Sequence, residues 1–233
     1  MNIVIPAAGR GQRFRDAGYL LPKPLIDVAG RTMISRVITS LMPKGEYRVI
    51  AAVPPGTPEM YDVEQVVVNK TTDGAARTVA LAIHTAQLDL NEPLLVSNAD
   101  QIVDFDVDEF IQMAHGSAGS LVVFFEEEGS PKWSYARLRG RMVLEVAEKR
   151  PISQYATGGI YYWSRTRDFL DAATQMIVMN DRTNGEFYVA PVYNYLIHEG
   201  YDITSYPVPA ASFHSMGTPE DLKTYIEYLT SRV

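Results

Sequence analysis

Between Met1 and Leu25 the chain holds the side chains and turns best suited to bind an anion. An apolar run at residues 3–5 leads into a loop of small residues, in which Gly9 and Gly11 let main-chain N–H groups approach an anion closely. Cationic side chains follow at Arg10, Arg13, Arg15 and Lys23. This combination predicts a polyphosphate site. The alternative, a solvated loop whose arginines only aid solubility, leaves the glycines without a purpose.

Two common nucleotide-binding loops do not fit this segment. A Walker A loop continues with Lys and Ser or Thr after its second glycine, whereas Gly11 is followed by Gln12 and Arg13. A dinucleotide fingerprint needs a small residue at the position of Phe14 and an acid after the next strand, but the run at 47–53 ends in two prolines. We therefore expect a phosphate-binding loop of another kind.

The chain resembles the sugar-phosphate nucleotidylyltransferases in four stretches that follow one another in the family's order. The first is Ala-Ala-Gly-Arg-Gly-Gln-Arg-Phe at 7–14 with Pro-Lys-Pro at 22–24, where that family has Ala-Ala-Gly-x-Gly-x-Arg-Phe/Leu and then Pro-Lys-Pro. The others are Asn-Ala-Asp at 98–100, Glu-Lys at 148–149 and Gly-Thr-Pro at 217–219. The resemblance implies a Rossmann-like three-layer α/β fold with a mixed, mainly parallel central sheet.

Apolar runs typical of strands alternate with helical patterns along the chain, as in an open α/β sheet. We expect strands at 2–5, 47–53, 65–68, 94–97, 120–125, 135–138, 142–146 and 159–163. We expect helices at 32–41, 73–86, 107–114, 166–179, 187–199 and 219–230. The interpretation is a single domain, residues 1–233, with a nucleotide-binding half at 1–106 and an acceptor-binding half at 107–233. Ala7, Asn69 and Asn98 would meet at the carboxyl ends of the strands.

The resemblance implies which residues of the first half bind the nucleotide. The loop after residue 70 would read the base with main-chain groups, and Gly74 lets that backbone approach a flat ring. Asp73 is also a candidate N-cap for the helix that follows, a role that can coexist with binding. The implied nucleotide-binding residues are Ala7, Ala8, Gly9, Arg10, Gly11, Thr72, Gly74 and Asn98.

Asp100 follows the buried run at 94–97, where a carboxylate can hold a hard cation such as Mg²⁺. An Asx turn is the alternative role, and the flanking motifs favour the metal. The family's second metal acid lies two residues before the late glycine, where this chain has Ser215. Either Asp100 holds the metal with phosphate oxygens and water alone, or another acid such as Asp104 or Asp106 helps. We expect His214 to be simply packed.

Three stretches of the second half resemble the family's acceptor site. Lys149 would bind the acceptor's phosphate and Glu148 one of its hydroxyls, although an exposed turn of mixed charge remains the alternative. Gly159 and Tyr161 follow at the family's spacing, and the alternation of a strand lets at most one of Tyr161 and its neighbour line the cleft. Glu186 either lies near the acceptor or stabilises the N-terminus of a helix, and the two readings are equal.

The resemblance implies transfer of a nucleotidyl group from a nucleoside triphosphate to a sugar 1-phosphate, with Mg²⁺ as the cofactor. Arg13, Lys23, Asp100 and Lys149 would be the catalytic residues. Synthesis of a capsule or glycoconjugate precursor is the class of pathway it suggests. Three alternatives stay open: a phosphocholine-like cytidylyltransferase, a non-catalytic nucleotide-binding homologue and a nucleotide-sugar glycosyltransferase. The first would use an aromatic and acidic cage, for which the candidates are Trp133, Tyr135, Tyr161, Trp163 and Glu186.

Composition narrows the partners further. The formal net charge of −7 argues against sequence-independent binding to nucleic acid or to an acidic membrane. The sequence has no cysteine, so it can form neither a disulfide nor a thiolate metal site. It also shows neither a basic and apolar leader nor an apolar run near the ~18 residues of a membrane span. We expect a cytoplasmic enzyme with small-molecule substrates. Because the chain stops at Val233, we expect no appended acetyltransferase β-helix.

Overall fold

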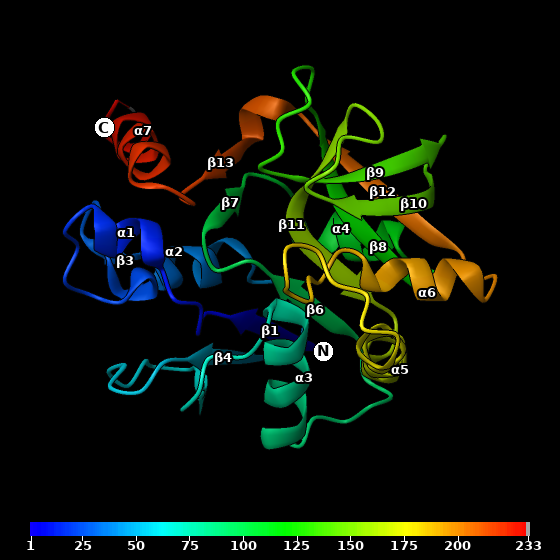
Figure 1. The fold of residues 1–233 in the computed structure, drawn as a ribbon, viewed down its shortest axis with the longest axis horizontal. Helices are drawn as coiled ribbons and strands as arrows, with labels where there is room; N and C mark the ends of the chain where they lie inside the picture. Colours follow the sequence, from blue (N-terminus) through cyan, green and yellow to red (C-terminus); the bar gives the residue numbers. More distant parts are fainter. Residues whose placement is uncertain (232–233) are drawn as a thin grey trace.

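A nine-stranded sheet forms the centre of the structure, a computed structural model that describes residues 1–231. The strand order is β5-β4-β1-β6-β11-β8-β12-β10-β9 (Figure 1). The strands are β1 (Asn2–Pro6), β4 (Arg48–Val53), β5 (Glu64–Val67), β6 (Leu94–Ser97), β8 (Gly119–Phe125), β9 (Ser134–Arg139), β10 (Met142–Glu148), β11 (Tyr155–Trp163) and β12 (Ile203–Val208).

The sheet is mixed and mainly parallel, which confirms the expected fold class. Neighbouring strands among β5, β4, β1 and β6 are parallel, and so are β8 and β12. Only β10 and β11 run against the other strands of this sheet. Because β11 pairs with β6 in the register Tyr161↔Val96, the two halves of the chain share one sheet.

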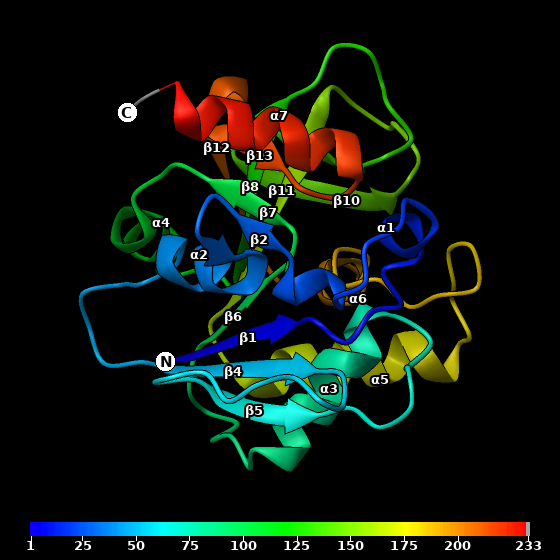
Figure 2. The same ribbon diagram turned by 90° about the vertical axis from the view of Figure 1, so that its left-hand side faces the viewer.

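Helices cover both faces of the sheet and complete a three-layer arrangement (Figure 2). The α-helices are α1 (Gln12–Asp16), α2 (Met33–Ser40), α3 (Ala75–Thr85), α4 (Val107–Met113), α5 (Thr166–Val178), α6 (Val192–His198) and α7 (Pro219–Thr230). Two short 3₁₀ helices lie at Lys23–Leu25 and Ala210–Ser212. None of the helices within residues 1–231 combines the length and apolar character needed to cross a membrane.

Alternation along the strands builds two cores, one on each face of the sheet. Val4 packs with buried side chains of α3, α5 and α6, whereas Ile3 and Ile5 pack with those of α1, α2, α4 and α7. Successive side chains of a strand point to opposite faces, so a single apolar run such as β1 serves both cores. This explains why the central strands read as continuous apolar runs in the sequence.

Two small sheets lie beside the large one. β2 (Asp27–Val28) pairs with β3 (Arg31–Thr32), and β7 (Gln101–Val103) pairs with β13 (Phe213–Ser215) in the register Ser215↔Gln101. The Met216 N–H also donates to the Asp100 carbonyl at 2.8 Å. The second pairing therefore brings the late Gly217 motif next to Asp100, although the two are far apart in sequence.

The expected helix at 187–199 was wrong in its first turn, and several strands were not expected. α6 begins only at Val192. Phe187 cannot be helical there because its N–H donates to the Asp73 carbonyl and its own carbonyl accepts from Ala76. The unexpected strands are β2, β3, β7 and β13, of two or three residues each, together with the longer β12. β7 and β13 depend on a partner strand that is distant in sequence, whereas β2 and β3 pair across a short turn.

Candidate active site

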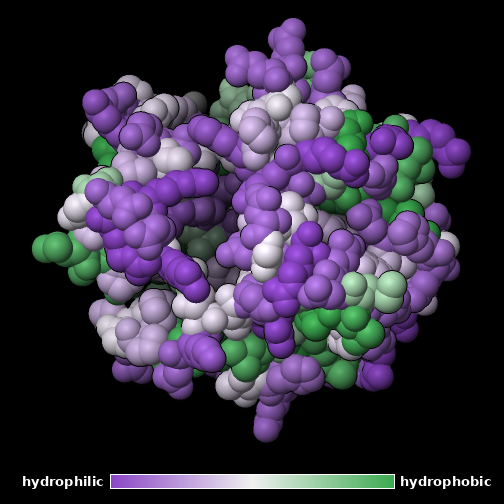
Figure 3. Space-filling view, in the orientation of Figure 1, coloured by the Kyte–Doolittle hydropathy of each residue, from purple (hydrophilic) through white to green (hydrophobic). Residues whose placement is uncertain are grey.

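A cleft of about 770 Å³ opens at the carboxyl ends of β1 and β6. In the space-filling view the surface is hollowed left of the centre, and hydrophilic side chains surround the hollow (Figure 3). Its volume lies in the usual range for small-molecule sites. The charged residues that line it are Arg13, Lys23, Asp100, Lys132, Glu148, Lys149 and Asp221.

One wall of the cleft is the loop between β1 and α1. Gly11 adopts φ +59°, and a Cβ atom there would lie 3.1 Å from Lys23 Cβ, so this turn and the close approach of Lys23 both favour glycine. Phe14 is buried and anchors α1, while Gly9, Gly11 and Arg13 line the cleft. Arg10 is exposed and is not among the lining residues.

Asp100 lies opposite this loop and is paired with a cation. Lys23 Nζ lies 2.5 Å from Asp100 Oδ2 and donates to the Gly217 carbonyl at 3.3 Å. The two side chains are 17% and 30% exposed, so the pair is only partly screened by water. A carboxylate that already binds an ammonium, beside a carbonyl oxygen, has the donor chemistry that Mg²⁺ requires. By the chemistry of its oxygen donors Asp100 fits a divalent cation, but within residues 1–231 no group of three or more His, Asp or Glu side chains that could hold a metal lies together.

The floor of the cleft is formed where β6 ends. The Asn98 N–H donates to the Gly159 carbonyl at 2.9 Å, and Asn98 Nδ2 donates to Gln101 Oε1 at 2.9 Å. Gly159 has φ +71°, and a Cβ atom there would collide with Gln101 Oε1. Gly159 thus lies beneath the lining residues Asn98 and Gln101 and lets them pack onto β11, instead of lining the cleft itself.

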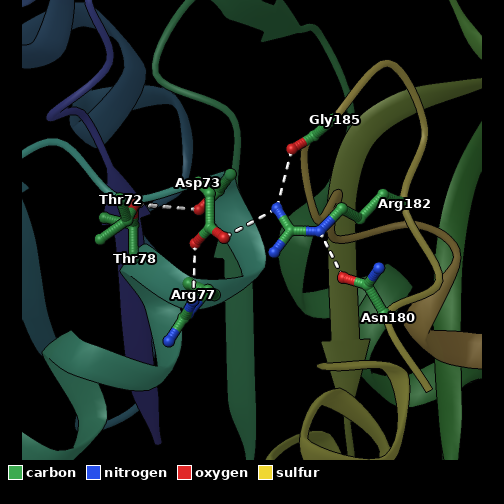
Figure 4. A network of polar contacts seen from close by, with 8 residues as sticks. Thr72, Asp73, Arg77, Thr78, Asn180, Arg182 and Gly185 are labelled. Carbon is green, nitrogen blue, oxygen red and sulfur yellow. Dashed lines mark hydrogen bonds and ion pairs between the residues drawn. The ribbon is translucent and has the colours of Figure 1, made fainter. Parts of the chain in front are cut away.

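The loop before α3 is fixed by a network that crosses to the second half of the chain (Figure 4). Asp73 does not cap α3, because Gly74 is the N-cap and the Asp73 carboxylate binds Arg77 and Arg182 at 2.9 and 2.7 Å. Burial acts to raise the pKa of Asp73, but the hydrogen bonds from Arg182 and Arg77 outweigh it and hold this pKa below its ordinary value. The Thr72 hydroxyl meets that of Thr78.

Arg182 ties this network to the loop at 180–187. Its guanidinium donates to Asn180 Oδ1 at 2.7 Å and to the Gly185 carbonyl at 2.9 Å, and it lies 4.1 Å from the centre of the Phe187 ring. Gly74 packs directly on the Phe187 backbone, since a Cβ atom there would collide with it. The loop before α3 and the loop at 180–187 are therefore held as one unit.

Glu148 lies at the end of β10 on the opposite wall. The Ser134 hydroxyl donates to Glu148 Oε2. Burial raises the pKa of Glu148, and the bond from Ser134 and the charge of Lys149 act in the other direction. A buried carboxylate is unfavourable unless it accepts hydrogen bonds, and the hydroxyls of a ligand could donate them.

Lys149 adopts φ +54°, a conformation that is uncommon for residues other than glycine. Its N–H donates to the Trp133 carbonyl at 2.9 Å, and its ammonium donates to the Tyr188 hydroxyl at 2.6 Å. This conformation turns the ammonium into the cleft. Burial raises the pKa of Tyr188, and a hydrogen bond to Glu186 acts in the same direction, so the hydroxyl stays protonated.

Residues 3–167 match the MobA-like NTP transferase domain family, a match that covers well over half of the chain. The chain belongs to this family. The matched segment contains the β1–α1 loop, Asp100, Glu148 and Lys149, whereas Ser215, Gly217 and Asp221 follow it.

Several curated relatives of this NTP transferase domain are named mannose-1-phosphate guanylyltransferases. The chain is 30% identical over 152 residues to a probable mannose-1-phosphate guanylyltransferase 2 of Arabidopsis thaliana, over 56% of this chain and 40% of the relative. It is 28% identical over 232 residues to the bifunctional protein GlmU of Cupriavidus metallidurans, over 93% of this chain and 49% of the relative. The chain thus spans about half the length, or less, of these relatives.

Solved structures share the whole fold. The nucleoside-diphosphate-sugar pyrophosphorylase of Vibrio cholerae RC9 has a TM-score of 0.83 and 26% identity, over 97% of this chain and 99% of that one. A UDP-glucose pyrophosphorylase complexed with UDP-glucose has a TM-score of 0.79 and 16% identity, over 100% and 99% of the two chains, and this second likeness shows the fold alone.

Some of the sequence-predicted residues line the cleft, and the others lie outside its lining. Lining residues are Ala7, Gly9, Gly11, Arg13, Lys23, Asn98, Asp100, Glu148, Lys149 and Tyr161. Residues outside the lining are Ala8, Arg10, Asn69, Thr72, Gly74, Gly159 and Glu186. Tyr162 packs in the core on the other face, as strand alternation requires. Glu186 is exposed and precedes α6 by several residues, so its alternative role at a helix N-terminus was wrong.

Sequence reasoning missed three charged or aromatic residues of the lining: Lys132, Tyr188 and Asp221. Asp221 lies two residues after the Gly-Thr-Pro motif, so extending that motif by two residues would have found it. Tyr188 lies in the Asn-Gly-Glu-Phe-Tyr stretch at 184–188, from which only Glu186 was predicted as a site residue. Lys132 has no motif and becomes visible only in the fold.

The acids considered as partners for Asp100 lie elsewhere. Asp106 caps α4 by accepting the Glu109 N–H at 3.0 Å, and Asp104 lies 3.3 Å from His214 Nε2. Neither lines the cleft. The His214 ring packs against Tyr225 and Tyr228, with 4.3 Å between the ring centres of His214 and Tyr228, in line with the expected packing role.

The aromatic cage considered for a phosphocholine-like acceptor does not form. Tyr135 and Trp163 are fully buried in the two cores, and Trp163 stacks on Tyr193 with 4.5 Å between the ring centres. Trp133 and Tyr161 line the cleft. Trp163 lies on the same face of β11 as Tyr161 but two residues further along the strand, where it packs against Phe169 and Tyr193 in the core.

Proposed function

We propose that the chain transfers a nucleotidyl group from a nucleoside triphosphate to a sugar 1-phosphate and releases pyrophosphate, with Mg²⁺ as cofactor. The observation that carries the proposal is the composition of the two walls of the cleft. One wall has the glycine loop with Arg13 and Lys23, and the other has the partly buried Glu148 beside Lys149. A triphosphate fits the first wall and a phosphorylated, hydroxyl-rich acceptor fits the second.

The reaction needs no general base from the protein. The second pKa of a phosphate monoester is about 6, so the acceptor phosphate is already an anion at neutral pH. One of its oxygens bonds to the α-phosphorus, and the bond from that phosphorus to the oxygen bridging to the β-phosphate breaks. Positioning and charge neutralisation would then supply most of the rate.

Each charged residue of the lining has a proposed role. The N–H groups of residues 9–11 and Arg13 bind the β- and γ-phosphates and stabilise the departing pyrophosphate. Lys23 neutralises the attacking and α-phosphates, Lys149 binds the acceptor's phosphate, and Glu148 accepts from an acceptor hydroxyl. Asp100 would hold Mg²⁺, which supplies charge neutralisation at the α-phosphate when bound. Tyr161 and Glu186 would border the acceptor.

The relatives suggest which substrates to test first. Several are named mannose-1-phosphate guanylyltransferases, so GTP with mannose 1-phosphate is the first pair. The structures named for thymidylyl and inositol-1-phosphate CTP transfer are 18% and 15% identical and support the fold alone. A pathway to a capsule or other polysaccharide precursor, and a cytoplasmic location, stay predictions.

A substrate panel tests the proposal. Each of five nucleoside triphosphates is combined with sugar 1-phosphates and with phosphocholine, and pyrophosphate is measured in the presence of Mg²⁺. We expect release that requires both substrates, favours a sugar 1-phosphate and falls at least 100-fold in Asp100→Asn. Release with phosphocholine alone would favour the cytidylyltransferase. Saturable triphosphate binding without release for any pair would favour a non-catalytic homologue.

A further inference from the structure

Ser215 stands where the resembled family has its second acid for the metal, and the structure shows what this serine contacts. Its Oγ accepts the Gly217 N–H at 3.1 Å and donates to Asp221 Oδ2 at 3.2 Å. The serine therefore holds a carboxylate that α7 supplies.

Asp221 belongs to the first turn of α7, but its side chain turns away from the helix end. Thr218 caps the helix by accepting the Asp221 N–H at 3.1 Å. An acid at this position commonly returns to the N–H of the capping residue. Here Oδ2 accepts from Ser215 and Oδ1 lies 3.7 Å from Lys132 Nζ. The carboxylate lines the cleft, and 21% of the side chain is exposed.

The carboxylates of Asp100 and Asp221 both approach the position that a side chain at Gly217 would take. A Cβ atom at this glycine would lie 3.8 Å from Asp100 Oδ2, 3.7 Å from Asp221 Oδ2 and 3.3 Å from Ser215 Oγ. Three oxygen atoms of the kinds that a hard cation prefers thus lie within 4 Å of one position that no side chain fills. The Lys23 ammonium is bound to Asp100 Oδ2 and to the Gly217 carbonyl, so these oxygens already attract positive charge.

We propose that Asp221 supplies the second carboxylate of the divalent-cation site, and that Ser215 is its positioning residue. The proposal rests on the proposed function for the presence of an ion at Asp100. A second anionic oxygen strengthens the binding of a hard cation, and the Ser215 hydroxyl fixes the orientation of that carboxylate. The site would keep two acids although a serine stands two residues before Gly217.

A purely structural role for Asp221 predicts different behaviour. An acid in the first turn of a helix stabilises the positive helix N-terminus, whatever lies in the cleft. Glu220 lies in the same turn of α7 and lines a separate shallow depression with Tyr19 and Lys223. Glu220→Gln therefore removes the same charge from the same helix turn and leaves the cleft unchanged, which makes it the matched control.

The test is direct binding of Mn²⁺, without nucleotide, to the full chain, followed by the electron paramagnetic resonance of the free ion. We expect Asp221→Asn to weaken Mn²⁺ binding roughly tenfold, Asp100→Asn at least as much and Ser215→Ala about threefold. Glu220→Gln should stay within about twofold of the unchanged protein. Adding Ser215→Asp to Asp221→Asn should restore most of the lost affinity, because it returns an acid to the same space.

The contrary results are equally distinct. Unchanged Mn²⁺ affinity in Asp221→Asn, with weaker binding in Asp100→Asn, would assign Asp221 to helix capping alone. A protein without saturable Mn²⁺ binding in the millimolar range, or with equal affinity in all variants, would also overturn the proposal. Thermal unfolding of each variant checks that it is folded. Failure of the proposed function would show separately, as absence of pyrophosphate release from every substrate pair by a protein that does bind Mn²⁺.

Discussion

Arg182 Nη1 lies 2.7 Å from Asp73 Oδ2, and this ion pair joins the loop before α3 to the loop before α6. Both side chains are about one-third exposed, so we expect the pair to add less than ~1 kcal/mol to stability. The pair matters more for where it holds the second loop than for stability. The loop that Arg182 braces carries Tyr188, whose hydroxyl accepts a hydrogen bond from the Lys149 ammonium.

Arg182→Gln should therefore disturb acceptor binding more than stability. We expect the KM for the acceptor to rise several-fold with little change in the KM for the triphosphate. Arg167→Gln, at an exposed position of α5, is the control and should match the unchanged protein. Steady-state kinetics with each substrate varied in turn would measure both constants, and an equal rise in both would contradict a role on the acceptor side.

The same pair predicts a pH dependence. Because the folded pKa of Asp73 lies below its ordinary 3.8, the pair stabilises the fold above pH 3.8 and this contribution fades as the pH falls through the lowered pKa. The difference in Tm between the unchanged protein and Arg182→Gln should be constant from pH 5 to 7 and shrink below pH 4. A difference that grows in acid would show that another group controls it.

Glu148 should show the opposite sign. Its folded pKa is raised, so the folded state binds its proton more tightly and loses stability as the pH rises from 4.5 through the raised pKa. Glu148→Gln removes this cost, which is about 1.4 kcal/mol for each tenfold gain in the proton affinity of the carboxylate. We expect a higher Tm than the unchanged protein at pH 7.5, a smaller difference at pH 4.5 and a higher KM for the acceptor. A variant less stable at pH 7.5 would contradict the account.

Gly74 tests the close packing of the two loops. A Cβ atom at Gly74 would collide with the Phe187 backbone, whereas one at Gly200 meets nothing within 4 Å, and both glycines have positive φ. Gly74→Ala should therefore cost more than Gly200→Ala, by ~1–3 kcal/mol, because only the first adds overpacking to backbone strain. Urea unfolding of both variants measures the difference. Equal losses would show that strain alone matters and that the loops separate easily.

Arg13→Ala and Lys149→Ala should fail in different ways. Arg13 is assigned to the triphosphate and Lys149 to the acceptor's phosphate, and each charge-assisted bond is worth ~1.5–3 kcal/mol. The first variant should raise mainly the KM for the triphosphate, and the second mainly that for the acceptor, by roughly one to two decades. Identical defects toward both substrates would undo the assignment of the two walls.

The sequence was sufficient for eight of the nine strands of the large sheet, all except β12, and for residues whose roles follow from local chemistry. Continuous apolar runs such as 3–5 and 94–96 predicted the central strands because both faces of the sheet are buried. The role of Gly11 could be predicted because the turn after β1 requires a positive φ. The helix at 219–230 was predicted to the residue, since Thr218 and Pro219 form a strong start signal.

What the sequence could not supply depends on contacts between distant segments. β7 and β13 have three residues each, and each forms a strand only because it pairs with the other. Asp73 is a residue type that commonly caps helices, yet its carboxylate pairs with Arg182, more than a hundred positions later. Asp221 likewise resembles a helix-start acid until Ser215 and the Gly217 space are seen beside it. Local patterns do not encode such partners.

Isotope tracing of the acceptor phosphate tests the central claim most directly. A sugar 1-phosphate that carries ¹⁸O on its three non-bridging oxygens is turned over with the preferred triphosphate, and the products are weighed by mass spectrometry. If the acceptor phosphate attacks the α-phosphorus, all three labelled oxygens appear in the nucleotide-sugar and none in the pyrophosphate. Label in the pyrophosphate, or a nucleotide-sugar without label, would contradict nucleotidyl transfer by this chain.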